Sequence, residues 1–468
     1  MTTSNDFALT TPAGVTALLD ELLASEPSHE HRPPLTYLRR KAGRGLVAVY
    51  GTASNSSQIY TVTVDEAALG AAVGTAEGTV PAVGIHPAWQ GHWPGLVEEP
   101  ALGVSVQAFP TDRKLPALAA AMMPSQQQAL WDALQSAGRE TLPDSGSWTL
   151  ASAEAEPVRY KPGDRCVVRY RLRFERPGTA GPEQASCSII GKLYRQPVQA
   201  EAAGALLNRL RAGTDGSWCP APLVTVGTLA MLLSEDLGTS SGNPPTLAGT
   251  QVINPGDSSA LSTIALAADA LADLHTSSVA DAGTPIRTGA DEAVKAGKRA
   301  QVLSNYLPGL VDEIDRVSVE LRARLEGLEP DVCRPAHGSY KSSQLLVRDG
   351  AVFVVDFDQF CLADPALDVG YFLAYLRPPG LWYGRAGTRD WFEAAAEAFR
   401  SAYTAASVRR GVEASVCKSI LKRAAVYEAA LLMKIAARRA NRLHSPRPTE
   451  VQAVLNEITA CLSASERG

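Results

Sequence analysis

The most constraining feature of this chain is the stretch HGSYKSSQLLVRDGAVFVVDFDQF, which runs from His337 to Phe360. Its apolar runs 345–347 and 351–355 are joined by an Asp-Gly turn, and this pattern predicts a β-hairpin. The polar loop 337–340 precedes the hairpin, and the acidic segment Asp356–Asp358 follows it. Acidic side chains at a strand end beside a His-Gly loop indicate a site for a metal ion and phosphate groups. The loop itself carries no carboxylate.

The composition excludes several classes of protein. The chain has 468 residues, of which 45% are hydrophobic and 20% charged, as in an ordinary globular protein with more than one domain. A net charge of −5 gives no indication of a nucleic-acid partner or of an anionic membrane surface. We therefore expect no nucleic-acid and no membrane partner.

The cysteine spacing and the N-terminal sequence indicate the cellular compartment in which the protein is expected. The 7 cysteines are scattered and never spaced as C-x-x-C, which favours reduced thiols over disulfides or a structural zinc site. The N-terminus lacks a basic start followed by an apolar run, so no signal peptide is expected. No apolar stretch approaches the roughly 20 residues that cross a bilayer. We expect a cytoplasmic protein of unknown oligomeric state.

Changes in composition predict three parts of the chain. Residues 1–140 are expected to form an N-terminal α/β accessory domain, and the polar interval 137–157 indicates a linker after it. Residues 150–238 are rich in strand-like patterns and predict a small lobe. Residues 239–468 are mostly helical in pattern and predict a large lobe that contains the hairpin.

Local patterns place elements within these parts. Helices are expected at 15–22, 126–134, 198–210, 260–276, 292–326 and 390–462, and strands at 45–50, 59–64, 187–195 and 230–238. Two further strand-like runs flank a turn at Lys161–Asp164. In the second run Tyr170, Leu172 and Phe174 alternate with arginines, so one face is apolar and the other basic.

One short pattern of residue spacing occurs in both of the first two parts. Lys41, Gly43, Val47 and Tyr50 have the same spacing as Lys161, Gly163, Val167 and Tyr170. The match has two explanations, chance and a duplication that makes the N-terminal domain a degenerate repeat of the small lobe.

Taken in chain order, the motifs resemble those of the aminoglycoside phosphotransferase and choline kinase superfamily of protein-kinase-like enzymes. That superfamily has a His-Gly-Asp-x-x-x-x-Asn loop, a hairpin ending in an Asp-Phe/Trp-Asp-like segment, and a Gly-Asp-Pro-x-x-Asp helix start. Here the matching segments are His337–Gln344, Asp356–Asp358 and Ala363–Asp368. The resemblance covers roughly residues 155–460.

The resemblance implies an α+β, bilobal, protein-kinase-like fold preceded by the additional N-terminal domain. It also implies that ATP, or another nucleoside triphosphate, and Mg²⁺ are cofactors. The residues implied to lie at the nucleotide are Lys161, Gly163, Lys192, Glu201 and Glu235. Lys192 would contact the phosphates, and Glu201 would hold Lys192 by an ion pair. Asp356 and Gln344 would bind the metal.

Ser339 is the main departure from the superfamily pattern. It occupies the position of the Asp that accepts the proton of the substrate hydroxyl, and a serine hydroxyl has no useful basicity near neutrality. The loose transition state of phosphoryl transfer makes little demand on deprotonation, so transfer need not be abolished. Asp358 is a candidate substitute base, with a structural cap as its alternative.

The function hypothesis is phosphoryl transfer from ATP to a hydroxyl of a small molecule, with altered general-base chemistry. A peptide acceptor stays open. The alternative is a catalytically impaired pseudokinase that binds a nucleotide or substrate as a regulator or scaffold. A third hypothesis is a kinase-like fold used for another transfer reaction.

Several nearby residues have a plain structural interpretation. His337 is expected to bond the backbone around its loop, and His275 to pack at a helix end. The arginines 169, 171 and 173 are expected to form a solvated face, with phosphate contact as the alternative. Asp364 is expected to cap a helix whose first turn contains Pro365, and with Asp368 to brace the loop. The roles of Tyr340 and Lys341 stay open.

Overall fold

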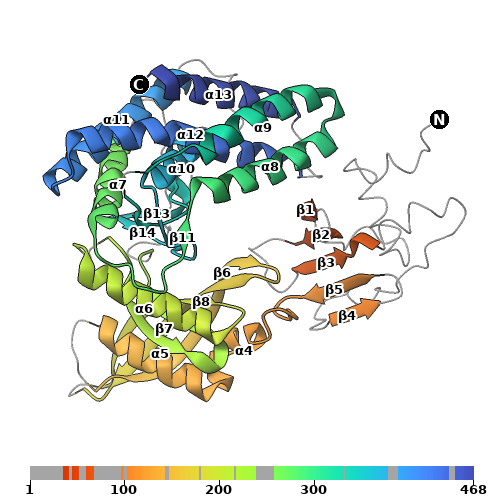
Figure 1. Ribbon diagram of the computed structural model, residues 1–468. Helices are drawn as coiled ribbons and strands as arrows, with labels where there is room; N and C mark the ends of the chain where they lie inside the picture. The colour runs from red at the N-terminus through yellow and green to blue at the C-terminus, as the bar shows by residue number, and fades with distance from the viewer. Residues whose placement is uncertain are drawn as a thin grey trace, which may run out of the picture. The chain divides into compact units, whose positions relative to one another are not determined.

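The computed structural model describes residues 35–41, 45–51, 59–67, 96–99, 103–142, 147–178, 181–215, 218–238, 258–330, 332–377, 388–441 and 448–467. The chain divides into two compact units (Figure 1). The first consists of residues 1–204, 222–235 and 439–447, and the second of residues 205–221, 236–438 and 448–468. The expected helix at 15–22 lies outside the described residues.

The first unit begins with a five-stranded antiparallel sheet in the order β1-β2-β3-β5-β4. Its strands are β1 (Leu35–Lys41), β2 (Gly45–Tyr50), β3 (Tyr60–Val64), β4 (Leu96–Glu99) and β5 (Val104–Ala108). The strands expected at 45–50 and 59–64 are therefore confirmed. Leu46, Ala48 and Tyr50 alternate on the buried face of β2, as the period of a strand requires.

A second five-stranded antiparallel sheet follows, in the order β6-β7-β8-β10-β9. Its strands are β6 (Thr149–Lys161), β7 (Arg165–Arg176), β8 (Glu183–Leu193), β9 (Pro222–Val226) and β10 (Met231–Glu235), and α6 (Pro197–Gly213) lies between β8 and β9 in the chain. The predicted linker at 137–157 is wrong. A helix extends to Thr141, and β6 begins at Thr149.

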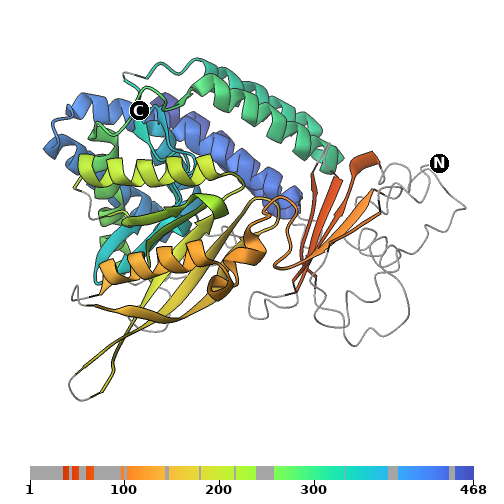
Figure 2. The same ribbon diagram turned by 90° about the horizontal axis from the view of Figure 1, so that it is seen from below.

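Helix α5 (Gln128–Thr141) covers one face of this second sheet (Figure 2). The predicted alternation on β7 is confirmed, because Tyr170, Leu172 and Phe174 are buried and pack with the apolar side of α5. Close approach requires Gly138, since a Cβ there would lie 2.4 Å from Cζ of Phe174. The short helices α4 (Leu118–Ala121), η5 (Pro124–Gln126) and η6 (Gly227–Leu229) complete this part.

The two sheets share one strand order and one turn register. Lys41 pairs with Gly45 across the β1–β2 turn, and Lys161 pairs with Arg165 across the β6–β7 turn. This shared topology supports the duplication hypothesis, although Gly43 lies outside the described residues. The domain boundaries near 140 and 238 stay predictions.

The second unit is mainly helical. Its helices are α7 (Ser258–Thr276), α8 (Gly289–Tyr306), η7 (Pro308–Leu310), α9 (Val311–Glu326), η8 (Ser342–Gln344), α10 (Ala366–Leu376), α11 (Thr388–Arg409), α12 (Ala414–Ala440) and α13 (Pro448–Arg467). The predicted hairpin is confirmed as β13 (Leu345–Arg348) and β14 (Ala351–Val354). A small sheet contains β11 (Ile286–Arg287), β15 (Cys361–Ala363) and β12 (Arg334–Ala336) in that order.

The expected α+β fold class is confirmed by a strand-rich part that is followed by a helix-rich part. Helix α10 is almost completely buried, and it approaches α12 closely at Gly370. Among the described residues, no helix is long and apolar enough to cross a membrane.

Gly370 provides a test of this packing. A Cβ at this position would lie 2.7 Å from the Ala424 carbonyl oxygen and from the Glu428 amide nitrogen, and both are backbone atoms. Gly370→Ala should therefore lower the free energy of unfolding by about 1–3 kcal/mol, as overpacking usually does. Urea denaturation measures this change. The control is Gly309→Ala, since a Cβ on Gly309 would meet nothing within 4 Å. Equal stability of both variants would show that α10 and α12 are less closely packed.

Candidate active site

The His-Gly loop is held by buried polar groups around it. It lies between β12 and η8, and the Asp368 carboxylate on α10 accepts hydrogen bonds from the amides of His337 (2.6 Å) and Tyr340 (3.3 Å). Arg287 donates to the Gly338 carbonyl at 2.6 Å. Gly338 has φ +73°, and a Cβ there would lie 2.0 Å from the Gln359 carbonyl oxygen, so only glycine fits.

His337 has the structural role expected of it. Its ring is fully buried, and Nε2 lies 3.2 Å from the Val355 carbonyl oxygen, to which it donates. Burial lowers the pKa of His337 despite the opposing effect of the Asp368 carboxylate, so the neutral ring is favoured. With Nε2 as the donor, Nδ1 is left as an acceptor, and the Ser339 hydroxyl lies 3.4 Å from it.

Ser339, Gln344 and Asp356 are brought together. The Gln344 amide Nε2 lies 3.2 Å from the Ser339 hydroxyl and 3.3 Å from Oδ2 of Asp356. Gln344 Oε1 is buried and has no hydrogen-bond partner among the described residues. A buried carbonyl oxygen without a partner is costly unless something else satisfies it.

The backbone at Asp356 is strained. Asp356 has φ +72°, which a residue with a side chain adopts only where its surroundings enforce it. The preceding residue, Val355, donates its amide to the Gln344 carbonyl at 2.9 Å. The contacts of Val355 therefore hold the Asp356 carboxylate beside the Gln344 side chain.

The oxygen atoms of this group fit a magnesium ion. The Asp356 carboxylate and the unsatisfied Oε1 of Gln344 are the hard ligands that Mg²⁺ prefers. No group of three His, Cys, Asp or Glu side chains that could hold a metal occurs in the described part of the chain. Mg²⁺ usually keeps several waters and takes one or two protein carboxylates plus substrate phosphates, so a sparse set of protein ligands is compatible with it.

Asp358 lies in an exposed turn after the hairpin. The turn is closed by the Phe360 amide, which donates to the Phe357 carbonyl at 2.9 Å. Its role as a substitute base stays a prediction.

The other candidate residues lie in the first unit. Lys192 on β8 is half-buried between Val167 and Leu232, and its amine lies 5.1 Å from the centre of the Tyr194 ring. Glu201 is exposed on α6, and Glu235 is half-buried at the end of β10. The Lys192–Glu201 ion pair and the nucleotide contacts of these residues stay predictions.

The glycine-containing turn at 161–164 is fixed by a residue that the sequence patterns did not single out. Gly163 has φ +65°, and its amide donates to the Asp112 carboxylate at 2.7 Å. The same carboxylate accepts from the Tyr160 hydroxyl at 2.8 Å and from the Lys114 amide at 2.8 Å. Lys161 forms an ion pair with Asp164. Burial, together with Asp112, raises the pKa of Tyr160, so its hydroxyl stays a donor.

Residues 183–413 match the family model described as the phosphotransferase enzyme family, APH. This segment, just under half of the chain, is similar to the phosphotransferase enzyme family. The match contains Lys192 and Glu201 as well as the His-Gly loop and the Asp356–Asp358 segment, and it confirms the predicted resemblance.

Solved structures of low sequence identity are similar to this chain. A putative aminoglycoside phosphotransferase from Ralstonia eutropha JMP134 is 17% identical, with a TM-score of 0.47 over 73% of this chain and 98% of that one. A glucosamine kinase is 18% identical, with a TM-score of 0.43 over 95% and 99% of the two chains. A choline/ethanolamine kinase family protein from Mesorhizobium loti is 17% identical, with a TM-score of 0.41 over 64% and 89%. No curated protein matches the sequence.

The predictions for Asp364 and Asp368 have different outcomes. Asp368 braces the loop as expected, and His275 packs beside it with Nε2 3.5 Å from Oδ2 of Asp368. The predicted cap is displaced by one residue, because Pro365 occupies the N-cap position and α10 begins at Ala366. Asp364 still accepts from the Ala366 amide at 3.1 Å, and it forms a buried bidentate pair with Arg423.

A cluster of cations lies beside the His-Gly loop. Lys341, two residues after Ser339, has its amine 5.4 Å from the centre of the Tyr375 ring. Lys434 on α12 bonds the Tyr371 hydroxyl. Burial and the neighbouring cations, among them Arg438 and Lys341, lower the pKa of Lys434 to about 6. The sequence patterns did not single out Lys434, because its neighbours come from distant segments.

The lowered pKa of Lys434 predicts a pH dependence of stability. An unfolded lysine has a pKa of about 10.4, so between about pH 6 and pH 10 the unfolded chain binds more protons. Stability contributed by this group is therefore smallest below about pH 6 and rises with pH through that window. Urea denaturation at several pH values should give a smaller slope for Lys434→Met than for the wild type. Lys418→Met, which changes an exposed lysine of the same helix, should keep the wild-type slope. Equal slopes for both variants and the wild type would contradict the prediction.

Proposed function

We propose that this protein transfers a phosphoryl group from ATP, or another nucleoside triphosphate, to a hydroxyl group of a small molecule in a magnesium-dependent reaction. The observation that carries the proposal is the buried Gln344 Oε1, which lacks a partner among the described residues and belongs to a side chain that contacts Asp356. These oxygens lie within the segment that matches the phosphotransferase family. The acceptor is proposed only as a class, and a hydroxylated peptide is the other outcome of a product assay.

Asp356 and Gln344 would hold the metal ion in this proposal. When bound, Mg²⁺ neutralises charge on the phosphate oxygens. The chain's own residues orient the ligands, because the Gln344 amide nitrogen donates to Ser339 and to Asp356, and this fixes which end of the amide is the free oxygen. Lys192, Glu201, Glu235 and the turn with Lys161 and Gly163 are proposed to bind the nucleotide.

Ser339 has a different role in this proposal from the aspartate of the superfamily. Its hydroxyl lies between Nδ1 of His337 and Nε2 of Gln344, so it donates to the first and accepts from the second. Ser339 therefore orients Gln344 instead of removing a proton. Transfer without a carboxylate base in the loop is compatible with a loose transition state. No contact in the described structure favours the pseudokinase alternative.

Magnesium-dependent stabilisation by ATP tests the proposed site. A ligand that binds the folded state alone raises the free energy of unfolding by about 2.7 kcal/mol at a hundredfold excess over its dissociation constant. Magnesium-ATP should raise the melting temperature of the wild type, and Asp356→Asn and Gln344→Leu should lose most of the magnesium-dependent part. Asp349→Asn, which changes an exposed aspartate in the turn of the same hairpin, should retain it. A wild type without any shift at roughly millimolar magnesium-ATP, far above ordinary dissociation constants, refutes the proposal.

Substitution of Ser339 tests the altered base chemistry. Ser339→Asp restores the superfamily pattern, and single-turnover phosphate transfer to hydroxylated compounds should be equal or faster, by up to ~10²–10⁴-fold if deprotonation limits turnover. The new carboxylate would lie near Asp356, so like-charge repulsion should make the metal-free variant less stable than the wild type. Ser343→Asp, which adds the same charge at an exposed position of η8, is the control. A wild-type rate far above that of Ser339→Asp would mean that the serine takes part in the chemistry directly.

A further inference from the structure

Trp218 is a buried residue that contacts the end of β14 at the proposed metal site. Its backbone carbonyl accepts the Val354 amide at 2.6 Å, and the centre of its ring lies 6.1 Å from that of Phe357. The Phe357 ring also lies beside the His337 ring, with ring centres 4.7 Å apart. Phe357 directly follows Asp356 in the chain, so Trp218 and His337 together limit where the Asp356 backbone can move.

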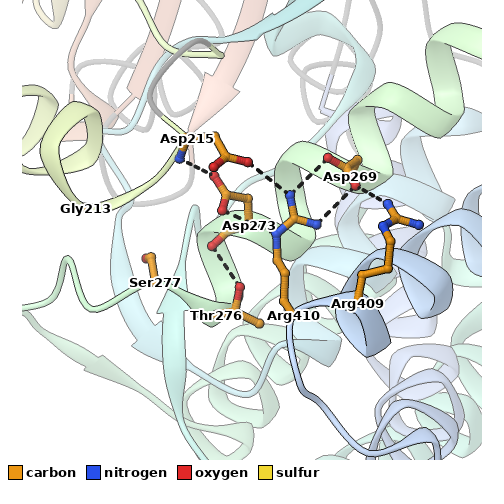
Figure 3. A pocket seen from close by; sticks show the side chains of 8 residues that line it. All are labelled: Gly213, Asp215, Asp269, Asp273, Thr276, Ser277, Arg409 and Arg410. Atoms are coloured by element: carbon orange, nitrogen blue, oxygen red, sulfur yellow. Dashed lines mark hydrogen bonds and ion pairs between the residues drawn. The ribbon is translucent and has the colours of Figure 1, made fainter.

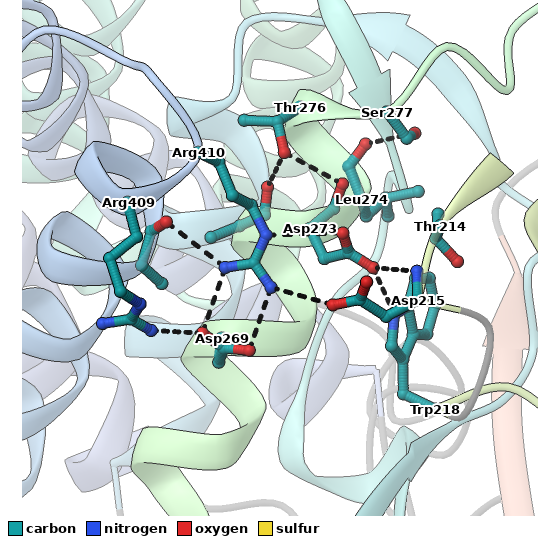
Figure 4. Close-up of polar contacts among 12 residues, drawn as sticks. Thr214, Asp215, Trp218, Asp269, Asp273, Leu274, Thr276, Ser277, Arg409 and Arg410 are labelled. Carbon is teal, nitrogen blue, oxygen red and sulfur yellow. Dashed lines mark hydrogen bonds and ion pairs between the residues drawn. The ribbon is translucent and has the colours of Figure 1, made fainter.

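The orientation of the Trp218 ring is set by Asp273 on α7. Oδ2 of Asp273 accepts a hydrogen bond from the indole Nε1 at 2.7 Å and another from the Asp215 amide at 3.0 Å (Figure 4). Trp218 is 6% exposed and Asp273 is 8% exposed, so water competes little with these bonds. Without this acceptor the indole N–H would be buried without a partner, which is costly.

Asp273 is in turn held by Arg410, which follows α11. The guanidinium lies 3.4 Å from Oδ1 of Asp273 and 3.1 Å from each carboxylate oxygen of Asp269 (Figure 3). It also reaches Asp215 at 3.4 Å. These residues line a mainly polar pocket of about 570 Å³. The pocket is therefore lined by an ion-pair network. Asp273 belongs to this network and also accepts the hydrogen bond of the Trp218 indole.

Asp356 requires this support because its conformation is unfavourable by itself. A non-glycine residue at φ +72° is strained, and it persists only if its neighbours are fixed. Val355 is fixed by bonds to Gln344 and His337. On the other side, the Phe357 carbonyl accepts the Phe360 amide at 2.9 Å, and the Phe357 ring packs against the rings of Trp218 and His337.

We propose that Trp218 is a positioning residue for the Asp356 carboxylate, and that Asp273 and Arg410 set the orientation of its ring. The proposal rests on the proposed function, in which Asp356 holds Mg²⁺. If the indole loses its hydrogen bond to Asp273, the ring no longer confines Phe357, and Asp356 relaxes away from Gln344. The expected consequence is weaker magnesium binding.

The test compares magnesium affinity in variants that keep or remove the hydrogen bond between Trp218 and Asp273. Mg²⁺ is titrated at a fixed concentration of ATP, and the melting temperature is recorded at each step. Trp218→Phe keeps an aromatic ring but lacks the N–H donor, and it should raise the midpoint magnesium concentration roughly two- to thirtyfold, the range in which distant residues modulate coupling. The control is Ser277→Ala, which lines the same pocket but donates only to the Leu274 carbonyl. Its midpoint should equal that of the wild type.

Two variants of Asp273 distinguish a role in positioning the Trp218 ring from a general loss of folding stability. Asp273→Asn keeps an oxygen that accepts the indole N–H, and it should leave the midpoint near that of the wild type. Asp273→Leu removes the acceptor at similar volume and should raise the midpoint as Trp218→Phe does. The double variant Trp218→Phe/Asp273→Leu should be no worse than either single variant, because both remove the same bond.

The outcomes distinguish this inference from the function on which it rests. A wild type that shows no magnesium-dependent shift overturns both. A wild type that responds to magnesium while Trp218→Phe has an unchanged midpoint, whatever its melting temperature without metal, overturns the inference alone. Additive effects in the double variant also overturn it, because they would mean that Trp218 and Asp273 act separately.

Discussion

The arrangement of the candidate active site depends on the buried carboxylate of Asp368. Burial by itself would raise the pKa of Asp368, but a hydrogen bond from His275 and bonds from loop amides hold it below its usual range. An ionised carboxylate without solvent is stable only with such partners. By accepting the His337 and Tyr340 amides, Asp368 determines where Ser339 and the start of η8 lie. The position of Gln344, and with it the proposed metal site, follows from this one buried charge.

Much of the fold could be predicted from local patterns. The alternation of β7 and the Asp-Gly turn of the hairpin are short-range signals, and both were interpreted correctly. The linker at 137–157 was interpreted wrongly because β6 is the edge strand of its sheet. An edge strand pairs on one side only, and β6 exposes residues on both faces, so it lacks the apolar alternation that identifies a buried strand.

The candidate site could be predicted only where its residues belong to one motif. Ser339, Gln344 and Asp356 lie within a short stretch of chain, and the superfamily pattern identifies all three. Asp112 bonds Gly163 across 51 residues, and Trp218 bonds Asp273 across 55. No periodicity or spacing connects such pairs. They become visible only when tertiary structure brings the segments together, and a side chain that supports another residue carries no signature of its own.

The shared topology of the two sheets has a consequence for binding stoichiometry. The position on β3 that corresponds to Lys192 on β8 is Thr63, since Thr63 pairs with Val47 as Lys192 pairs with Val167. Thr63 is neutral, and its hydroxyl bonds that of Ser105. A second sheet of the same strand order therefore does not supply a second phosphate-binding lysine at this position. If Lys192 binds the nucleotide, one equivalent of nucleotide per chain saturates the protein.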